Sequence, residues 1–332
     1  MVNKLKNFIK ENKGFLIFLL LFYIIMNYEL PYIIYTPGGA INLSERVSGT
    51  NTYGEDGSFS MTYVSIVKAK IPFVITSLVL PDWDIVPKEQ FTYDNNSVQE
   101  TLEIDKIYMD EAISNAEETA YRAAGVEYTI KKKENIVTYV HKDAKTKLKY
   151  GDVLIDVDGI PLDDIKVLQD YIQNKKKGDV IEIKYKRNNQ EYIDDVTLIE
   201  LDNRVKAGLS MAKVNEYETD YNINVKTKAS ESGPSGGLMT TLAIYNAITE
   251  EDITHGKKIM GTGTIESDGS VGEIGGVKYK LIGAVKKGAD VFICPVKNYQ
   301  EAKKVAKEKN YTIDIISAET FIDALNKIEA LE

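Results

Sequence analysis

Residues 231–237 of this 332-residue chain read Glu-Ser-Gly-Pro-Ser-Gly-Gly, and an apolar run with helical character begins at Leu238. Glycines around a serine let backbone N–H groups point outward, and a helix N-terminus favours negative charge. An oxyanion hole needs both properties, so Ser235 is a candidate nucleophile and Gly233 a candidate supporting residue. Two alternatives stay open here. One is a serine N-cap between flexible glycines; the other is a phosphate loop, although its usual Gly-Lys-Ser/Thr ending is missing.

A pair of lysines offers this serine a possible base. Residues 274–285 read Ile-Gly-Gly-Val-Lys-Tyr-Lys-Leu-Ile-Gly-Ala-Val, which predicts a helix with Lys278 and Lys280 in its first turn. The helix dipole disfavours a cation at this end and lowers its pKa, as burial also does. A neutral lysine amine is able to take a proton from a serine hydroxyl. Both lysines flank the same apolar face, so spacing does not choose between them, and two solvated surface lysines are the alternative.

Three motifs occur in a fixed order: Gly-Pro-Ser-Gly-Gly at 233–237, Gly-Thr-Gly-Thr-Ile at 261–265 and Gly-Gly-Val-Lys-Tyr-Lys at 275–280. Together they resemble the proteolytic domain of Lon peptidases, over residues 204–330. That family works with a serine–lysine dyad and without histidine. The chain has two histidines, and both lie outside the three motifs.

The resemblance assigns a role to each candidate residue. It implies that Ser235 is the nucleophile and that Lys280, which lies 45 residues further along the chain, is the base. It also implies that Thr262 hydrogen-bonds the lysine and holds its amine toward the serine. Lys278 is the fallback base.

The sequence departs from the ATP-dependent Lon enzymes at two places. Ser232 stands where they usually have aspartate, and Gly236 stands where they have alanine. These differences affect the surroundings of the dyad and leave Ser235 and Lys280 in place. The chain also has no Walker A sequence, so we expect peptide hydrolysis without ATP.

Residues 126–200 predict a second unit that is rich in strands. The run Leu-x-x-Gly-Asp-Val-Leu-x-x-Val-x-Gly at 148–159 resembles a PDZ domain. Such a domain holds an extended peptide by backbone pairing to a strand edge beside a helix. The expected partner is therefore a peptide or protein substrate, and a small β-rich module without a groove is the alternative.

The N-terminus predicts a membrane anchor. Residues 1–13 contain four lysines and one glutamate, and an unbroken apolar or small run follows from Gly14 to Met26. Extending that run gives a transmembrane helix over 14–34, about the 20 residues that a span needs. Its basic flank is expected in the cytoplasm, with the catalytic domain on the extracytoplasmic side. A cleaved signal peptide is the alternative.

Composition narrows the class of protein. Lysine and arginine number 41 against 50 aspartate and glutamate, and these charges are spread along the chain, which argues against a nucleic-acid partner. Cys294 is the single cysteine, so no intramolecular disulfide forms, and its apolar surroundings predict a small buried side chain in a strand. The two histidines form no recognisable metal pattern. We therefore expect no metal and no cofactor.

The sequence thus predicts an α+β multidomain protein: a transmembrane helix, a mixed extracytoplasmic region over 36–125 with a helix over 105–124, the PDZ-like domain and the Lon-type domain. This arrangement resembles bacterial membrane-anchored Lon-like peptidases, including those that process secreted pheromones. The predicted function is an ATP-independent serine endopeptidase that cleaves exported peptides or proteins at the outer face of the membrane. An inactive membrane-tethered PDZ scaffold is the alternative. Lon-type domains often form rings, so a homo-oligomer is possible.

Overall fold

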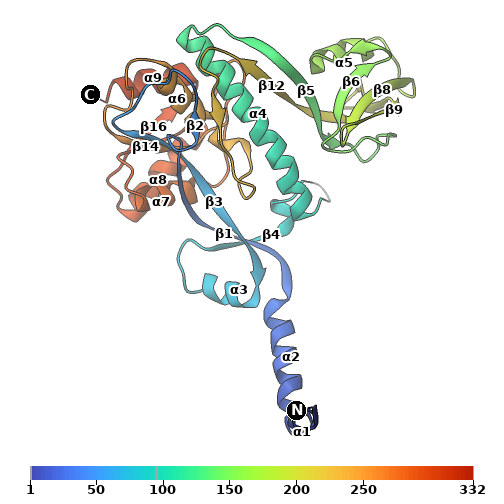
Figure 1. Ribbon diagram of the computed structural model, residues 1–332, viewed down its shortest axis with the longest axis vertical. Helices are drawn as coiled ribbons and strands as arrows, with labels where there is room; N and C mark the ends of the chain where they lie inside the picture. Colours follow the sequence, from blue (N-terminus) through green and yellow to red (C-terminus); the bar gives the residue numbers. More distant parts are fainter. Residues whose placement is uncertain (1, 94–95, 332) are drawn as a thin grey trace.

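The computed structural model describes residues 2–93 and 96–331 and shows a mixed α/β protein built around two six-stranded sheets (Figure 1). The first sheet combines strands from both ends of the sequence. Strand β14 lies parallel to β3 and to β15, and β15 is parallel to β16, whereas β1 is antiparallel to β3 and β4. In spatial order its strands are β16 (Asp314–Ala318), β15 (Val291–Pro295), β14 (Lys258–Gly261), β3 (Ser58–Lys70), β1 (Glu29–Asn42) and β4 (Asp84–Pro87).

Helices cover both faces of this sheet. Helices α6 (Gly237–Ile248) and α9 (Phe321–Glu329) belong to one apolar cluster, and α7 (Val277–Lys286) and α8 (Tyr299–Lys309) belong to another. Alternate side chains of β15 enter the two clusters: Val291 and Ile293 the first, Phe292 and Cys294 the second. This is the period-2 alternation of a strand buried on both faces. Cys294 is buried there as predicted.

The second sheet belongs to the PDZ-like unit and has its own apolar core. It contains the helix α5 (Ile165–Ile172) and ends at β12, a strand from beyond residue 200 that pairs antiparallel with β5. In spatial order the strands are β12 (Leu209–Glu218), β5 (Thr129–Val140), β6 (Val153–Val157), β8 (Val180–Arg187) and β9 (Gln190–Thr197), with β7 (Ile160–Pro161) paired to β6. Two short pairs complete the strands: β10 (Ile199–Leu201) with β11 (Arg204–Lys206), and β2 (Val47–Ser48) with β13 (Asn224–Val225).

The long helix α4 (Val98–Ala124) lies between the two sheets (Figure 1). It begins earlier than the predicted 105–124 because Ser97 and Glu100 form a capping box, in which each side chain accepts a hydrogen bond from the other residue's backbone N–H. It ends at Gly125, which adopts the left-handed conformation with φ +67°.

The predicted transmembrane helix over 14–34 is wrong. The N-terminal region forms two separate helices, α1 (Val2–Glu11) and α2 (Lys13–Asn27), and β1 already begins at Glu29. Helix α2 has 15 residues. At about 1.5 Å per residue it is roughly 22 Å long, whereas a bilayer core is about 30 Å thick. Among the described residues, no helix combines the length and apolar character needed to cross a membrane. The fold is therefore mixed α/β and multidomain without that element.

Three short helices complete the elements outside the site. Helix α3 (Ile71–Ser77) follows β3 directly and lies near α2, and η1 (Lys88–Gln90) follows β4. The 3-10 helix η3 (Val296–Asn298) joins β15 to α8. None of these elements contributes a side chain to the site described next.

Candidate active site

Three side chains from the three sequence motifs meet at one point. Ser235 lies in the 3-10 helix η2 (Pro234–Gly236), which leads into α6, and Lys280 lies in the first turn of α7. The Lys280 Nζ atom is 2.7 Å from Ser235 Oγ and 2.9 Å from Thr262 Oγ1. The Thr262 hydroxyl donates its own hydrogen to the Ser235 carbonyl oxygen at 2.9 Å, so its oxygen is free to accept from the lysine. Both side-chain contacts of Lys280 are therefore neutral hydroxyls.

Burial shifts Lys280 toward its neutral form. Its residue is only 3% exposed, and this burial lowers the pKa of the amine to about 7. Among the described residues, no carboxylate lies within ion-pair distance of Lys280 to oppose the shift. An amine that is largely neutral near pH 7 and 2.7 Å from a hydroxyl oxygen is placed to accept its proton.

Lys278, the fallback base, points to a different part of the protein. Its Nζ atom lies 2.6 Å from Asp84 Oδ2 and 3.8 Å from Asp82 Oδ1. The Tyr279 hydroxyl donates to the same Asp84 oxygen at 2.6 Å. The structure thus brings Lys280 to Ser235 and keeps Lys278 in an ion pair with the strand β4, where a cation is stabilised.

The backbone around Ser235 is held in a fixed conformation. Its carbonyl oxygen accepts from the N–H of Gly263 at 2.8 Å, in addition to the Thr262 hydroxyl. Gly233 has φ +93°, a conformation that costs an L-residue energy. The Gly233 N–H donates to the carbonyl oxygen of Asp105 at 2.9 Å. Ser235 itself lies in the first turn of η2, where backbone N–H groups lack an intrahelical acceptor.

Gly236 contacts a side chain that the sequence motifs did not reveal. A Cβ atom at this position would lie 2.6 Å from Met61 Sδ, so the glycine allows the methionine of β3 to lie against the nucleophile loop. This contact gives a physical reason for the glycine at the position where the resemblance leads one to expect alanine.

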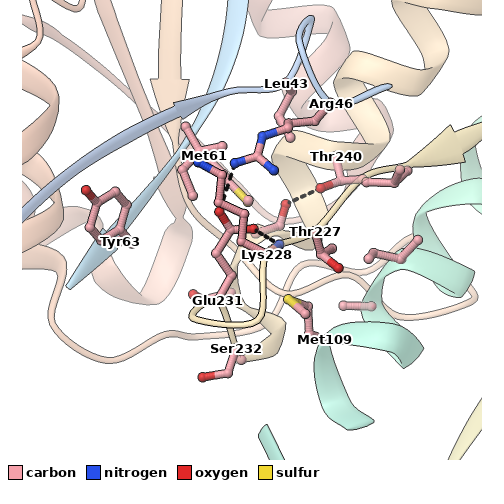
Figure 2. A pocket seen from close by; sticks show the side chains of 18 of the residues that line it. Leu43, Arg46, Met61, Tyr63, Met109, Thr227, Lys228, Glu231, Ser232 and Thr240 are labelled. Carbon is pink, nitrogen blue, oxygen red and sulfur yellow. Dashed lines mark hydrogen bonds and ion pairs between the residues drawn. The ribbon is translucent and has the colours of Figure 1, made fainter. Parts of the chain in front are cut away.

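A cavity of about 600 Å³ lies beside Ser235 (Figure 2). At one side Arg46 forms an ion pair with Glu231, with 2.9 Å between Nη2 and Oε1, and also donates to the Lys226 carbonyl oxygen. The pair ties the turn after β1 to the loop that carries the nucleophile. Apolar walls come from Leu43, Met61, Met109 and Ile113. The sequence did not predict these residues because β1, β3 and α4 lie far from the Lon-type motifs in the chain.

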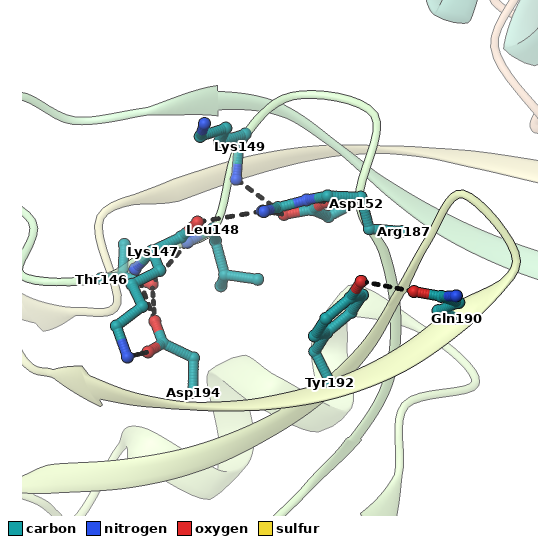
Figure 3. Close-up of polar contacts among 9 residues, drawn as sticks. All are labelled: Thr146, Lys147, Leu148, Lys149, Asp152, Arg187, Gln190, Tyr192 and Asp194. Atoms are coloured by element: carbon teal, nitrogen blue, oxygen red, sulfur yellow. Dashed lines mark hydrogen bonds and ion pairs between the residues drawn. The ribbon is translucent and has the colours of Figure 1, made fainter.

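The Gly-Asp pair of the PDZ-like motif has a structural role (Figure 3). Asp152 accepts two hydrogen bonds from the Arg187 guanidinium, each 2.6 Å long, and one from the Lys149 N–H at 2.7 Å. Asp194 accepts from the Thr146 hydroxyl in the same way, at 2.7 Å. These bonds fix the loop before β6 to β8 and β9, which explains the aspartate in the motif.

Comparisons with known proteins agree with both units. Residues 203–330 match the Lon protease (S16) C-terminal proteolytic domain, and residues 123–198 match the PDZ domain. The chain carries a Lon-type proteolytic domain and a PDZ domain. It also contains strands β1 and β3 and helix α4, which contribute to the site; both strands and all but the last two residues of the helix lie outside the matched segments.

The curated Lon proteases match about a third of this chain. A Lon protease of Campylobacter jejuni is 33% identical over 117 residues, which are 34% of this chain and 14% of that protein. A Lon protease of Clostridium beijerinckii is 32% identical over 124 residues, 37% of this chain and 15% of that protein. The chain thus spans about a seventh of the length of these relatives. The crystal structure of the PDZ domain of an SdrC-like protein from Listeria innocua is 28% identical, covers 24% of this chain and 92% of that chain, and has a TM-score of 0.23.

Proposed function

We propose that the protein is a serine endopeptidase with a Ser235–Lys280 dyad. The observation that carries the proposal is the 2.7 Å distance between Ser235 Oγ and the amine of a lysine whose pKa burial lowers to about 7. A peptidase domain of the Lon type on residues 203–330 supports this choice of reaction. The adjacent cavity of about 600 Å³ has room for side chains of a peptide.

Each step of peptide hydrolysis has a group in place. Neutral Lys280 takes the proton of the Ser235 hydroxyl while Oγ attacks the peptide carbonyl carbon. The N–H of Ser235, at the N-terminal end of η2, stabilises the negative charge that develops on the carbonyl oxygen. Lys280 then gives the proton to the leaving amine. The Lys280 amine, neutral again, takes a proton from water as the water oxygen attacks the acyl carbon. Lys280 then returns this proton to Ser235 Oγ as the acyl–oxygen bond breaks and the carboxylic acid product leaves.

Thr262 is a positioning residue in this scheme. Its hydroxyl contacts both the Ser235 carbonyl oxygen and the Lys280 amine, at 2.9 Å each. It therefore connects the backbone of the nucleophile to the base and keeps the amine pointing at Oγ when the serine moves to form the acyl-enzyme.

Three further features are part of the proposal. Hydrolysis does not require ATP, since the chain has no Walker A sequence. The PDZ domain binds an extended segment of the substrate. The substrates are exported peptides or proteins, cleaved outside the cytoplasm, and the protein acts alone or as a homo-oligomer.

The experiment is hydrolysis of fluorescein-labelled casein by the purified chain, with and without ATP. We expect cleavage that ATP does not accelerate and that Ser235→Ala abolishes, together with modification of Ser235 by a serine-directed phosphonate. Casein cleavage by Ser235→Ala at the wild-type rate would exclude the dyad. A chain that binds peptides but neither cleaves casein nor reacts with the phosphonate would instead be the inactive scaffold. Comparing exported peptides of wild-type and Ser235→Ala cells tests the location and the substrate class.

A further inference from the structure

Helix α4 contacts both the PDZ-like sheet and the loop that carries the nucleophile. One side of the helix lies along β12, and another side meets η2 and α6. Figure 1 shows the helix running between the two parts of the molecule. A displacement of α4 relative to β12 would therefore also change its contacts with η2.

On the PDZ side, two side chains of α4 accept hydrogen bonds from backbone N–H groups at the edge of a sheet. β12 is the end strand of its sheet. The N–H of Lys213 donates to Glu111 Oε1 at 2.7 Å, and the N–H of Asn215 donates to Ser114 Oγ at 2.9 Å. Residues two apart in a strand present their N–H groups to the same side. An extended peptide that added to this edge would need the same two N–H groups.

On the active-site side, the main chain of α4 holds a donor next to the nucleophile. The Asp105 carbonyl oxygen accepts from the N–H of Gly233, two residues before Ser235, at 2.9 Å. While it does so, this N–H is unable to stabilise an oxyanion, and Ser235 offers the remaining donor. Side chains of the next turns of the helix, Met109, Ala112 and Ile113, line the cavity.

Besides the aromatic contact of Tyr121 with Tyr217, the interface between α4 and β12 has a polar part that is incompletely satisfied. The Asn215 Oδ1 atom is buried without a hydrogen-bond partner among the described residues. Glu117 of α4 is held near Glu216 of β12, and burial together with that carboxylate raises the pKa of Glu117 to about 7. Both features cost stability, so this interface is easier to rearrange than an apolar one.

We propose that α4 is a movable link between the PDZ edge and the oxyanion site. An extended segment of the substrate pairs with the outer edge of β12 and takes the N–H groups of Lys213 and Asn215 from Glu111 and Ser114. The helix then shifts, and the N–H of Gly233 leaves the Asp105 carbonyl and becomes a second oxyanion donor. Substrates long enough to reach β12 are thereby cleaved faster than short ones. This inference rests on the proposed peptidase function.

The test is a disulfide that fixes α4 to β12. Ser114 Oγ lies 2.9 Å from the backbone nitrogen of Asn215, so the double variant Ser114→Cys, Asn215→Cys places two thiols on contacting residues. The native cysteine, Cys294, is buried and does not interfere. Mass spectrometry without reductant verifies the bond. The two single variants, given the same oxidant, are the matched controls.

We expect the oxidised double variant to hydrolyse fluorescein-labelled casein about fivefold to tenfold more slowly than the reduced form, in the range of ordinary coupling between sites. Hydrolysis of an acetyl-tripeptide coumarin amide, too short to reach β12, and phosphonate modification of Ser235 should be unchanged. Equal casein rates in the oxidised and reduced forms would overturn the inference while leaving the peptidase function intact. A wild-type chain that does not react at Ser235 would overturn the function itself.

A second variant gives an effect of opposite sign. Glu111→Ala releases the N–H of Lys213, so kcat/KM for casein should rise about threefold, within the range by which single residues alter coupling, while the rate on the short substrate stays constant. A merely structural role of Glu111 predicts that both rates fall together. That result would contradict the movable link.

Discussion

The dyad and the α4–β12 interface differ in how their polar groups are satisfied. At the dyad, Ser235, Thr262 and Lys280 bond to one another, and the lysine lies on a helix packed in an apolar cluster. In the polar part of the interface, burial and the charge of Glu216 raise the pKa of Glu117, and a buried amide oxygen lacks a partner among the described residues. The first arrangement favours one fixed geometry, whereas the second is easier to rearrange. The difference indicates that Lys280 is held in one position, whereas α4 is able to shift against β12.

The largest expected effect separates the two neighbouring lysines. Lys280→Met removes the base and should lower kcat on casein by about a thousandfold or more, within the range that general-base catalysis supplies. Lys278→Met removes only the ion pairs with Asp84 and Asp82 and should change kcat less than about threefold, as expected for partly exposed ion pairs. Steady-state kinetics on both purified variants measure this contrast. Equal losses in the two variants would mean that the lysines were assigned wrongly.

The next effect concerns the pH dependence of the reaction. Since burial lowers the pKa of Lys280 to about 7, the amine is protonated and inactive below that pH and neutral above it. We therefore expect kcat/KM to rise about tenfold per pH unit below pH 7 and to level off above it. Thr262→Val, which removes a neutral contact of the amine, should keep this shape while lowering the plateau about tenfold. A profile that stays flat between pH 6 and 9 would rule out a base that titrates there.

Replacing Gly233 tests whether the loop that carries Ser235 needs its backbone conformation. A Cβ atom at this position meets nothing within 4 Å, so Gly233→Ala adds no clash, but φ +93° is strained for an L-residue. We expect a loss of about 1–2 kcal/mol in the free energy of unfolding or a local change of the loop. Urea unfolding together with casein hydrolysis distinguishes the two. Retention of wild-type stability and activity would show that the loop does not need this conformation.

The smallest expected effect lies at the α4–β12 interface. The pKa of Glu117 is raised to about 7, so between its unfolded pKa and pH 7 the folded state keeps a proton that the unfolded state loses. Stability therefore falls as pH rises through that window, and the loss is complete above it. Glu117→Gln should raise the free energy of unfolding by about 1–2 kcal/mol at pH 8 and leave it unchanged at pH 4. An equal effect at both pH values would point to packing instead of charge.

The sequence predicted the parts of the site that depend on local motifs. A serine between glycines at a helix start indicates Ser235 from its own residues, whereas the roles of Thr262 and Lys280 are implied by the resemblance to Lon peptidases. Spacing in the sequence does not choose between Lys278 and Lys280. What separates them in the structure is the ion pair of Lys278 with Asp84, and these two residues are 194 positions apart in the sequence.

The remaining features are set by tertiary contacts. Arg46, Met61 and Asp105 reach the site because β1 and β3 join the Lon-type sheet and α4 packs against η2, and no periodicity in the sequence reports such pairing. The anchor prediction failed for a related reason. Apolar composition over 14–34 gave the length of a span, but the chain leaves the helix after Asn27 and continues into β1.

The central claim, a nucleophile activated by a buried lysine, is tested most directly by the rate at which a serine-directed phosphonate modifies Ser235 between pH 5 and 9. Mass spectrometry of the wild-type chain, with Lys280→Met as the control, gives both the site and the rate. We predict modification of Ser235, with a rate that rises through about pH 7 in the wild type and is lost in Lys280→Met. Modification of a different residue, or an equal rate in the two proteins at every pH, would contradict the dyad.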